Sequence, residues 1–121
     1  MTELAGKRVF LVEDEGSVAL LIEAMLEDLG CIVVASAAHL SKAQRLAGEI
    51  AADLAVLDVN IGGQLVFPVC DILAERGIPF IFSSGYGADG LRPNLRTWPV
   101  LKKPFTDADL HAALAAALSR D

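Results

Sequence analysis

Residues 54–57 are apolar at every position, and this run ends at a carboxylate, Asp58, closely followed by polar and glycine residues. A strand with one solvated face alternates apolar and polar residues, so an unbroken apolar run predicts a strand buried on both faces. Strands of this kind belong to parallel sheets, which bind ligands at the carboxyl ends of their strands. We therefore expect Asp58 at the mouth of a crevice along one edge of a parallel sheet.

Short apolar runs recur four more times in the chain, and amphipathic segments separate them. The further runs cover residues 9–12, 31–35, 78–82 and 99–101. Helices are expected over residues 16–29, over residues 40–50 after a Ser36 cap, from about 65 to 76, and after a Thr106 cap with Asp109 three residues on. Residues 88–97 form the weakest helical candidate, because a glycine and a proline interrupt them. The alternation predicts an α/β fold, a five-stranded parallel sheet with helices on both faces.

The bulk properties narrow the class of protein. The length of 121 residues, 54% of them hydrophobic, fits one domain with an ordinary core. The formal net charge of −6 argues against binding to nucleic acid or anionic membranes, whose phosphates would repel the chain. The apolar runs are too short for a membrane span or a signal peptide. The two cysteines lack CxxC spacing, which fits unbridged thiols in the cytoplasm.

Polar side chains follow four of the predicted strands at the point where each strand ends. These side chains belong to Glu13 and Asp14, to Asp58, to Ser84 and to Lys103. Because the carboxyl ends of parallel strands share one edge of the sheet, we expect these groups to converge. Three carboxylates within a few Å repel one another by about 1–4 kcal/mol per pair, so positive charge must compensate them. Mg²⁺, which prefers carboxylates, waters and phosphate oxygens, suits the cluster best, and Lys103 adds a second positive charge.

A carboxylate beside Mg²⁺, a hydroxyl and an ammonium group is equipped for phosphoryl transfer. The carboxylate attacks phosphorus, and the other three groups neutralise charge on the transferred oxygens. Acidic residues at strand ends are individually common as solvated loop residues. Their joint occurrence with a serine and a Lys-Pro pair at the ends of four strands is far more specific.

The chain resembles the receiver domains of bacterial two-component response regulators. Four motifs carry the resemblance: VEDE at residues 12–15, VLDVN at 56–60, FSSGYG at 82–87 and LKKPF at 101–105. They follow the family's order and span essentially the whole chain. The FSSGYG stretch is similar to the FATGUY subgroup of receivers, which lack an aromatic residue in the fifth strand.

The resemblance implies a flavodoxin-like receiver fold with strand order 2-1-3-4-5 and a role for each polar group. Asp58 becomes the phosphoacceptor, Ser84 the hydroxyl that moves toward the phosphoryl group, and Lys103 its ion-pair partner. The implied Mg²⁺ ligands are Glu13, Asp14, Asp58 and the backbone carbonyl of Asn60. Ser84 is preferred to Ser83 because it directly precedes a small residue, as the family's hydroxyl does, and because Ser83 points the other way along the strand.

Two positions depart from the commonest receiver pattern. Position 13 holds Glu where many receivers have Asp, so Glu13 is expected to reach the ion through a water. Position 100 holds Val where many receivers carry a switching aromatic residue. Tyr86, close to Ser84 in sequence, is the candidate replacement for that aromatic switch.

The leading interpretation is a stand-alone receiver of residues 1–121, because the chain ends directly after the fifth predicted helix. Such a protein accepts a phosphoryl group from a sensor histidine kinase or a phosphotransfer protein and then binds a target protein differently. It catalyses only its own phosphorylation and dephosphorylation. A phosphate sink, a relay intermediate and a direct effector fit the sequence equally.

Two rival interpretations come from other functional classes. A phosphohydrolase with an aspartyl-phosphate intermediate needs a second acid near its nucleophile, but Asn60 lies two residues after Asp58 and the chain has no cap insertion. A phosphorylation-independent interaction module with a vestigial site would fit the changes at positions 13 and 100. The retained Asp58, Ser84 and Lys103 favour the working receiver.

Overall fold

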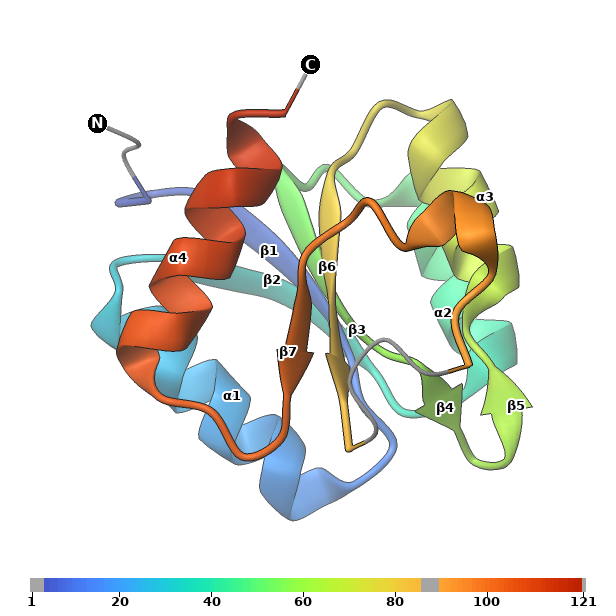
Figure 1. The fold of residues 1–121 in the computed structure, drawn as a ribbon, viewed down its shortest axis with the longest axis horizontal. Coiled ribbons are helices and arrows are strands. Elements are labelled where there is room, and N and C mark those ends of the chain that lie inside the picture. The colour runs from blue at the N-terminus through green and yellow to red at the C-terminus, as the bar shows by residue number, and fades with distance from the viewer. Residues whose placement is uncertain (1–3, 86–89, 121) are drawn as a thin grey trace.

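The computed structural model describes residues 4–85 and 90–120 and has a five-stranded parallel sheet at its centre (Figure 1). From one edge to the other, the strands are β2 (Ile32–Ala37), β1 (Arg8–Val12), β3 (Leu54–Asp58), β6 (Phe80–Ser84) and β7 (Val100–Lys102). When the strands of this sheet are numbered along the chain, their order is 2-1-3-4-5. The predicted fold class is therefore confirmed.

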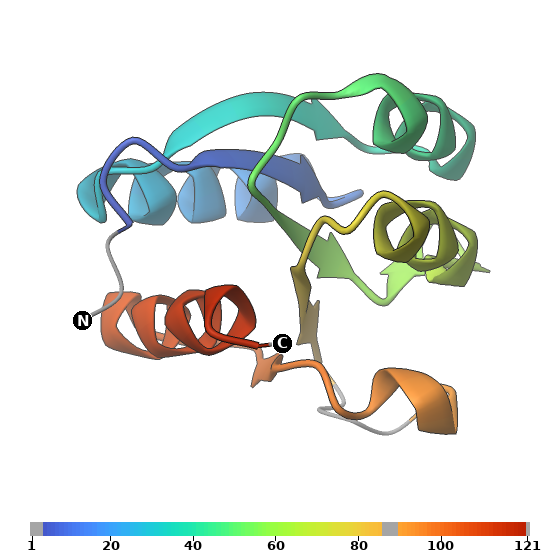
Figure 2. The ribbon, with the colours of Figure 1, turned by 90° about the horizontal axis from the view of Figure 1, so that it is seen from above.

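Two helices of the described residues cover each face of the sheet (Figure 2). α1 (Gly16–Asp28) and α4 (Asp107–Leu118) lie on one face, and α2 (Leu40–Glu49) and α3 (Phe67–Glu75) lie on the other. Right-handed crossovers between parallel strands produce this arrangement. Within the described ranges, no helix combines the length and the apolar character needed to cross a membrane.

The sheet separates two hydrophobic cores, and alternate residues of its central strands belong to different cores. In β1, Phe10 and Val12 pack with α2 and α3, whereas Val9 and Leu11 pack with α1 and α4. All four side chains are fully buried, and burial of a side chain of this kind is worth about 1.5–3 kcal/mol. Burial on both faces explains why these strands are apolar at every position.

Particular residues set the helix ends. Gly30 and Gly77 lie just beyond α1 and α3 with φ of 87° and 72°, a conformation that glycine adopts without a steric cost. At the start of α4, the Asp109 N–H donates to Thr106 Oγ1 at 3.1 Å, and the Thr106 N–H donates to Asp109 Oδ2 at 3.0 Å. The predicted capping box is therefore present.

The edge strand β2 is longer than the sequence suggested. Ser36 lies within β2 and caps no helix, because α2 begins only at Leu40. The pairing of β2 with β1 shifts by one residue, since Val33 and Ala35 face consecutive residues of β1. An extra residue of this kind is a bulge, which twists an exposed edge and makes it a poorer template for further strands.

Two segments next to the predicted site also differ from expectation. A short antiparallel hairpin, formed by β4 (Asn60–Ile61) and β5 (Gln64–Leu65), follows β3. α3 therefore begins at Phe67 rather than near residue 65. Of the weak helical candidate at residues 88–97, the described part contains a single 3-10 turn, η1 (Pro93–Leu95). The glycine and proline that weakened the prediction account for this outcome.

Candidate functional site

Three carboxylates meet at the carboxyl edge of the sheet. Glu13 and Asp14 follow β1, and Asp58 ends the neighbouring strand β3. One oxygen atom from each carboxylate lies within 4.8 Å of the others. Glu13 is 2% exposed and Asp58 is 9% exposed, whereas Asp14 faces solvent. The structure thus brings the three predicted acids together.

Lys103 bridges two of these acids. Its Nζ donates to Glu13 Oε1 at 2.7 Å and to Asp58 Oδ2 at 3.2 Å. Its backbone N–H donates to the Ser84 carbonyl oxygen at 2.8 Å, which fixes the lysine at the end of β7. The second oxygen of Glu13 accepts the Glu15 N–H at 3.2 Å. Both carboxylate oxygens of Glu13 therefore have partners within the protein.

Burial and charge together determine the protonation of these groups. Burial raises the pKa of Glu13, and the hydrogen bond from Lys103 opposes that shift only in part. Burial by itself lowers the pKa of Lys103, but its contacts with Glu13 and Asp58 outweigh this effect and raise the pKa. The pKa of Asp14 is lowered, mainly because its carboxylate accepts the Gly62 N–H. Lys103 is therefore a cation at neutral pH.

The β4–β5 hairpin is tied to the acids by main-chain hydrogen bonds. The Gly62 N–H donates to Asp14 Oδ2 at 2.8 Å, and the Asn60 N–H donates to Asp58 Oδ1 at 3.3 Å. Gly62 and Gly63 have φ of 58° and 87°, which the tight turn requires. The Gly63 N–H donates to Asn60 Oδ1 at 2.9 Å, so the Asn60 side chain serves the turn. The Asn60 side chain is thus used in the turn, and the predicted role of its backbone carbonyl as a Mg²⁺ ligand stays a prediction.

A cavity of about 180 Å³ opens beside Asp58. It is lined by Asp58, Val59, Asn60, Leu65, Ser84, Gly85 and Gly90. Ser83 and Ser84 are both buried, at 1% and 3% exposed, but only Ser84 belongs to this lining. The geometry therefore supports the choice of Ser84 over Ser83 as the hydroxyl that serves the site.

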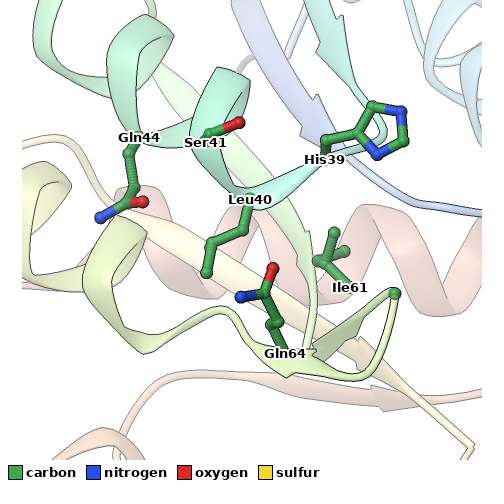
Figure 3. Close-up of a pocket in the computed structure, with 7 residues that line it drawn as sticks. His39, Leu40, Ser41, Gln44, Ile61 and Gln64 are labelled. Carbon is green, nitrogen blue, oxygen red and sulfur yellow. The ribbon is translucent and has the colours of Figure 1, made fainter.

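A second cavity, of about 370 Å³, adjoins the same hairpin at the start of α2 (Figure 3). Its lining consists of His39, Leu40, Ser41, Gln44, Ile61, Gly62 and Gln64. None of the predicted site residues belongs to it. The smaller cavity beside Asp58 is consequently the one that matters for chemistry at the acids.

The structure describes Val100 but not Tyr86, the residue predicted to replace an aromatic switch at that position. Val100 lies in β7, where it is half-buried, pairs in register with Phe82 and packs against the core on the α2 and α3 face. Tyr86, the candidate replacement for an aromatic switch, lies outside the described residues. The sequence predicted a turn at Gly62 and Gly63 and a helix from about Leu65, but neither Gly62 nor Leu65 was predicted as a site residue.

The donor set fits a magnesium ion. Three carboxylates face a single ammonium group, so the cluster carries net negative charge. Mg²⁺ binds one or two carboxylates and keeps several waters. Asp14 supplies an exposed carboxylate for this purpose, and Asp58 lies beside it with access to the cavity. Glu13 is the least available of the three, because its side chain is 1% exposed and its Oε1 lies 2.7 Å from Lys103 Nζ.

A parallel α/β sheet with an acid cluster, a serine and a Lys-Pro pair at its carboxyl edge defines a signalling receiver. The chain belongs to the response regulator receiver domain family, which it matches over residues 9–115. It is similar to SdrG from Sphingomonas melonis Fr1, whose solution structure has a TM-score of 0.83 and 38% identity and covers 98% of this chain and 99% of SdrG.

Two further relatives place the chain within this family. The receiver domain of the sensor histidine kinase PA1611 from Pseudomonas aeruginosa PAO1 has a TM-score of 0.76 and 26% identity, covering 96% of this chain and 100% of that one. Its crystal structure holds a magnesium ion in the active site cleft. The regulator PhyR from Methylorubrum extorquens is 30% identical over 119 residues, which cover 91% of this chain and 43% of PhyR. The chain spans less than half the length of the curated relatives it matches.

Proposed function

We propose that the protein accepts a phosphoryl group on Asp58 from a sensor histidine kinase or a phosphotransfer protein. The position of the Asp58 carboxylate carries this proposal. Its Oδ2 contacts Lys103 Nζ at 3.2 Å, and the residue lines the 180 Å³ cavity together with Ser84. A phosphoryl group on Asp58 would enter that cavity beside an ammonium, a hydroxyl and a pair of acids that can hold a cation.

Each of these groups has a role in the transfer. An Asp58 oxygen attacks phosphorus, and the bond between phosphorus and the donor atom breaks as the donor keeps the electron pair. Lys103 and Ser84 then contact the transferred oxygens, on which negative charge is concentrated. Such preorganised charge is the main way in which phosphoryl-transfer sites lower the barrier.

Mg²⁺ would be held by Asp14, Asp58 and the backbone carbonyl of Asn60, and it would supply further neutralisation of the phosphoryl oxygens. Glu13 is the third acid of the cluster and would lie farther from the ion than Asp14 and Asp58. Its side chain is 1% exposed and its Oε1 lies 2.7 Å from Lys103 Nζ, so an interaction with the ion through a water suits it better than direct contact.

Phosphorylation would change the surface that a target protein binds. A phosphoryl group carries a charge of about −1.5 to −2 and would compete with Glu13 for Lys103. Lys103 directly follows β7 and leads into α4, whereas Ser84 ends β6 and leads toward η1. A shift of these two side chains would therefore alter the surface formed by η1, β7 and α4. Equal target affinity before and after phosphorylation would contradict this part of the proposal.

In this proposal residues 1–121 act as one cytoplasmic receiver domain that catalyses only its own phosphorylation and dephosphorylation. A hydrolase that uses Asp58 as nucleophile is less well supported, because Asn60 occupies the position where such an enzyme needs its second acid. The serious rival is an interaction module that works without phosphorylation.

Incubation with acetyl phosphate and Mg²⁺, followed by intact mass measurement, separates these possibilities. We expect the mass of one phosphoryl group on the wild type, and none on Asp58→Asn or after removal of Mg²⁺ with EDTA. Circular dichroism of Asp58→Asn serves as the folding control. A folded wild type that gains no mass in the presence of Mg²⁺ would favour the interaction module.

A further inference from the structure

Leu65 is an exposed leucine that the hydrophobic cores do not explain. Its exposed fraction is 48%, and it belongs to neither core of the described residues. It lines the cavity beside Asp58 instead. Single exposed apolar residues are common on protein surfaces, so exposure alone would assign Leu65 no role. Its place in the wall of this particular cavity is the informative observation.

The hairpin holds Leu65 in a fixed relation to the acids. Leu65 pairs with Asn60 across the β4–β5 ladder, and residues that are directly opposite in such a ladder have Cβ atoms about 4.5–5.5 Å apart. The Asn60 N–H donates to Asp58 Oδ1, and the Gly62 N–H donates to Asp14 Oδ2. The same short hairpin therefore contacts two of the acids and presents Leu65 at the rim of the cavity.

We propose that Leu65 shields the phosphoryl group on Asp58 from water and thereby sets the lifetime of the phosphorylated state. This inference rests on the proposed phosphorylation of Asp58. In hydrolysis, a water oxygen bonds to phosphorus while the bond from phosphorus to the Asp58 oxygen breaks. The Asp58 carboxylate keeps the electron pair, and the water's protons remain with inorganic phosphate and solvent.

The attacking water needs both space and hydrogen-bond partners. A water occupies about 30 Å³ in the liquid, so a cavity of about 180 Å³ keeps room for one beside a phosphoryl group. The polarity of the cavity wall then decides, because a water is stable at a site only with about two to four polar partners. Among the residues that the structure describes, two apolar side chains larger than methyl line the cavity, those of Val59 and Leu65. Val59 is 7% exposed and packs into a core, so within the described part of the chain Leu65 is the apolar side chain positioned to exclude water at the rim.

Gln64, which precedes Leu65 in β5, supplies a matched control. Successive side chains of a strand point to opposite faces. Gln64, the other residue of β5, lines the separate cavity at the start of α2 (Figure 3). Gln64→Ala therefore shortens a side chain of similar length, on the same two-residue strand, without opening the cavity beside Asp58.

The lifetime of the phosphorylated protein tests the inference. Wild type, Leu65→Ala, Leu65→Gln, Leu65→Met and Gln64→Ala are phosphorylated with acetyl phosphate and Mg²⁺ and desalted, and the loss of phosphoryl mass is followed over time. We expect Leu65→Ala to shorten the lifetime several-fold. Leu65→Gln should do the same, because it keeps the volume but offers water a hydrogen bond. Leu65→Met and Gln64→Ala should keep the wild-type lifetime.

The outcomes separate this inference from the proposed function. A wild type that takes up no phosphoryl group overturns both. A wild type and a Leu65→Ala protein that are phosphorylated and decay at the same rate overturn the role of Leu65 alone. Faster decay in Gln64→Ala, to the same extent as in Leu65→Ala, would also overturn it, because loosening of the hairpin would then explain the effect. Thermal unfolding of each variant confirms that the compared proteins are folded.

Discussion

Replacement of Lys103 by methionine tests the electrostatic core of the site. The change keeps most of the side-chain length but removes the ammonium group that lies 2.7 Å from Glu13 Oε1 and 3.2 Å from Asp58 Oδ2. The Glu13 side chain is 1% exposed, so its charge would lose its partner without gaining contact with water. Removal of one partner from a buried ion pair typically costs about 3–5 kcal/mol.

The cost of leaving the Glu13 charge without a partner cannot exceed the free energy of protonating Glu13. From the ordinary pKa of 4.5, uptake of a proton at pH 7 costs about 3.4 kcal/mol, at about 1.36 kcal/mol for each pH unit. At pH 5.5 the same limit is about 1.4 kcal/mol. A carboxyl whose pKa is raised on folding favours the folded state at low pH, and this contribution is lost as the pH rises through the raised value. We therefore expect Lys103→Met to lose about 2–3.5 kcal/mol at pH 7 and about 1–1.5 kcal/mol at pH 5.5.

Urea unfolding, followed by the fluorescence of the single tryptophan, Trp98, measures these losses. The double variant Glu13→Gln with Lys103→Met should recover much of the stability, because the buried charge is then absent. Two results would show that the buried Glu13 charge does not depend on Lys103. One is additivity of the two single changes within about 0.5 kcal/mol. The other is a loss for Lys103→Met that is the same at pH 5.5 and at pH 7.

Three further predictions concern other parts of the fold. Thr106→Ala removes the cap of α4 and should cost about 1 kcal/mol in urea unfolding; an unchanged midpoint would contradict the capping role. The lowered pKa of Asp14 stabilises the protein above the ordinary value of 3.8, and this contribution is lost as the pH falls through the lowered pKa. Wild type should therefore lose more stability than Asp14→Asn on acidification below about pH 4, and parallel curves would disprove the effect of the Gly62 N–H. The Arg120 guanidinium lies 3.8 Å from the Trp98 ring centroid, so Arg120→Ala should cost about 0.5–1 kcal/mol and shift the tryptophan emission; unaltered emission would argue against the contact in solution.

The sheet and the acid cluster could be predicted because local sequence signals determine both. An apolar run such as residues 54–57 needs cover on both faces, and the polar residue that ends it must then lie at the carboxyl edge of the sheet. Glu13, Asp58 and Lys103 meet there because three strands end at the same edge. The shared edge of the sheet and the polar residues at the strand ends were enough to predict this part of the site.

The hairpin and its contacts could not be derived in the same way. Strands of two residues are too short to show periodicity, so β4 and β5 left only a glycine pair as a signal. The bond from the Gly62 N–H to Asp14 joins residues 48 positions apart, and a main-chain donor has no signature in the sequence. Ser36 has the residue type of a helix cap, but pairing with β1 keeps it within β2. Tertiary pairing outweighed local preference at each of these places.

The identity of the phosphorylated residue is the most direct test of Asp58 as the phosphoacceptor. The wild type is treated with acetyl phosphate and Mg²⁺, reduced with borohydride, which converts an aspartyl phosphate to homoserine, and mapped by peptide mass spectrometry. We predict homoserine at position 58 and unmodified Asp14 in the same sample. Modification of another carboxylate with Asp58 intact, or no modification of the folded protein, would contradict it.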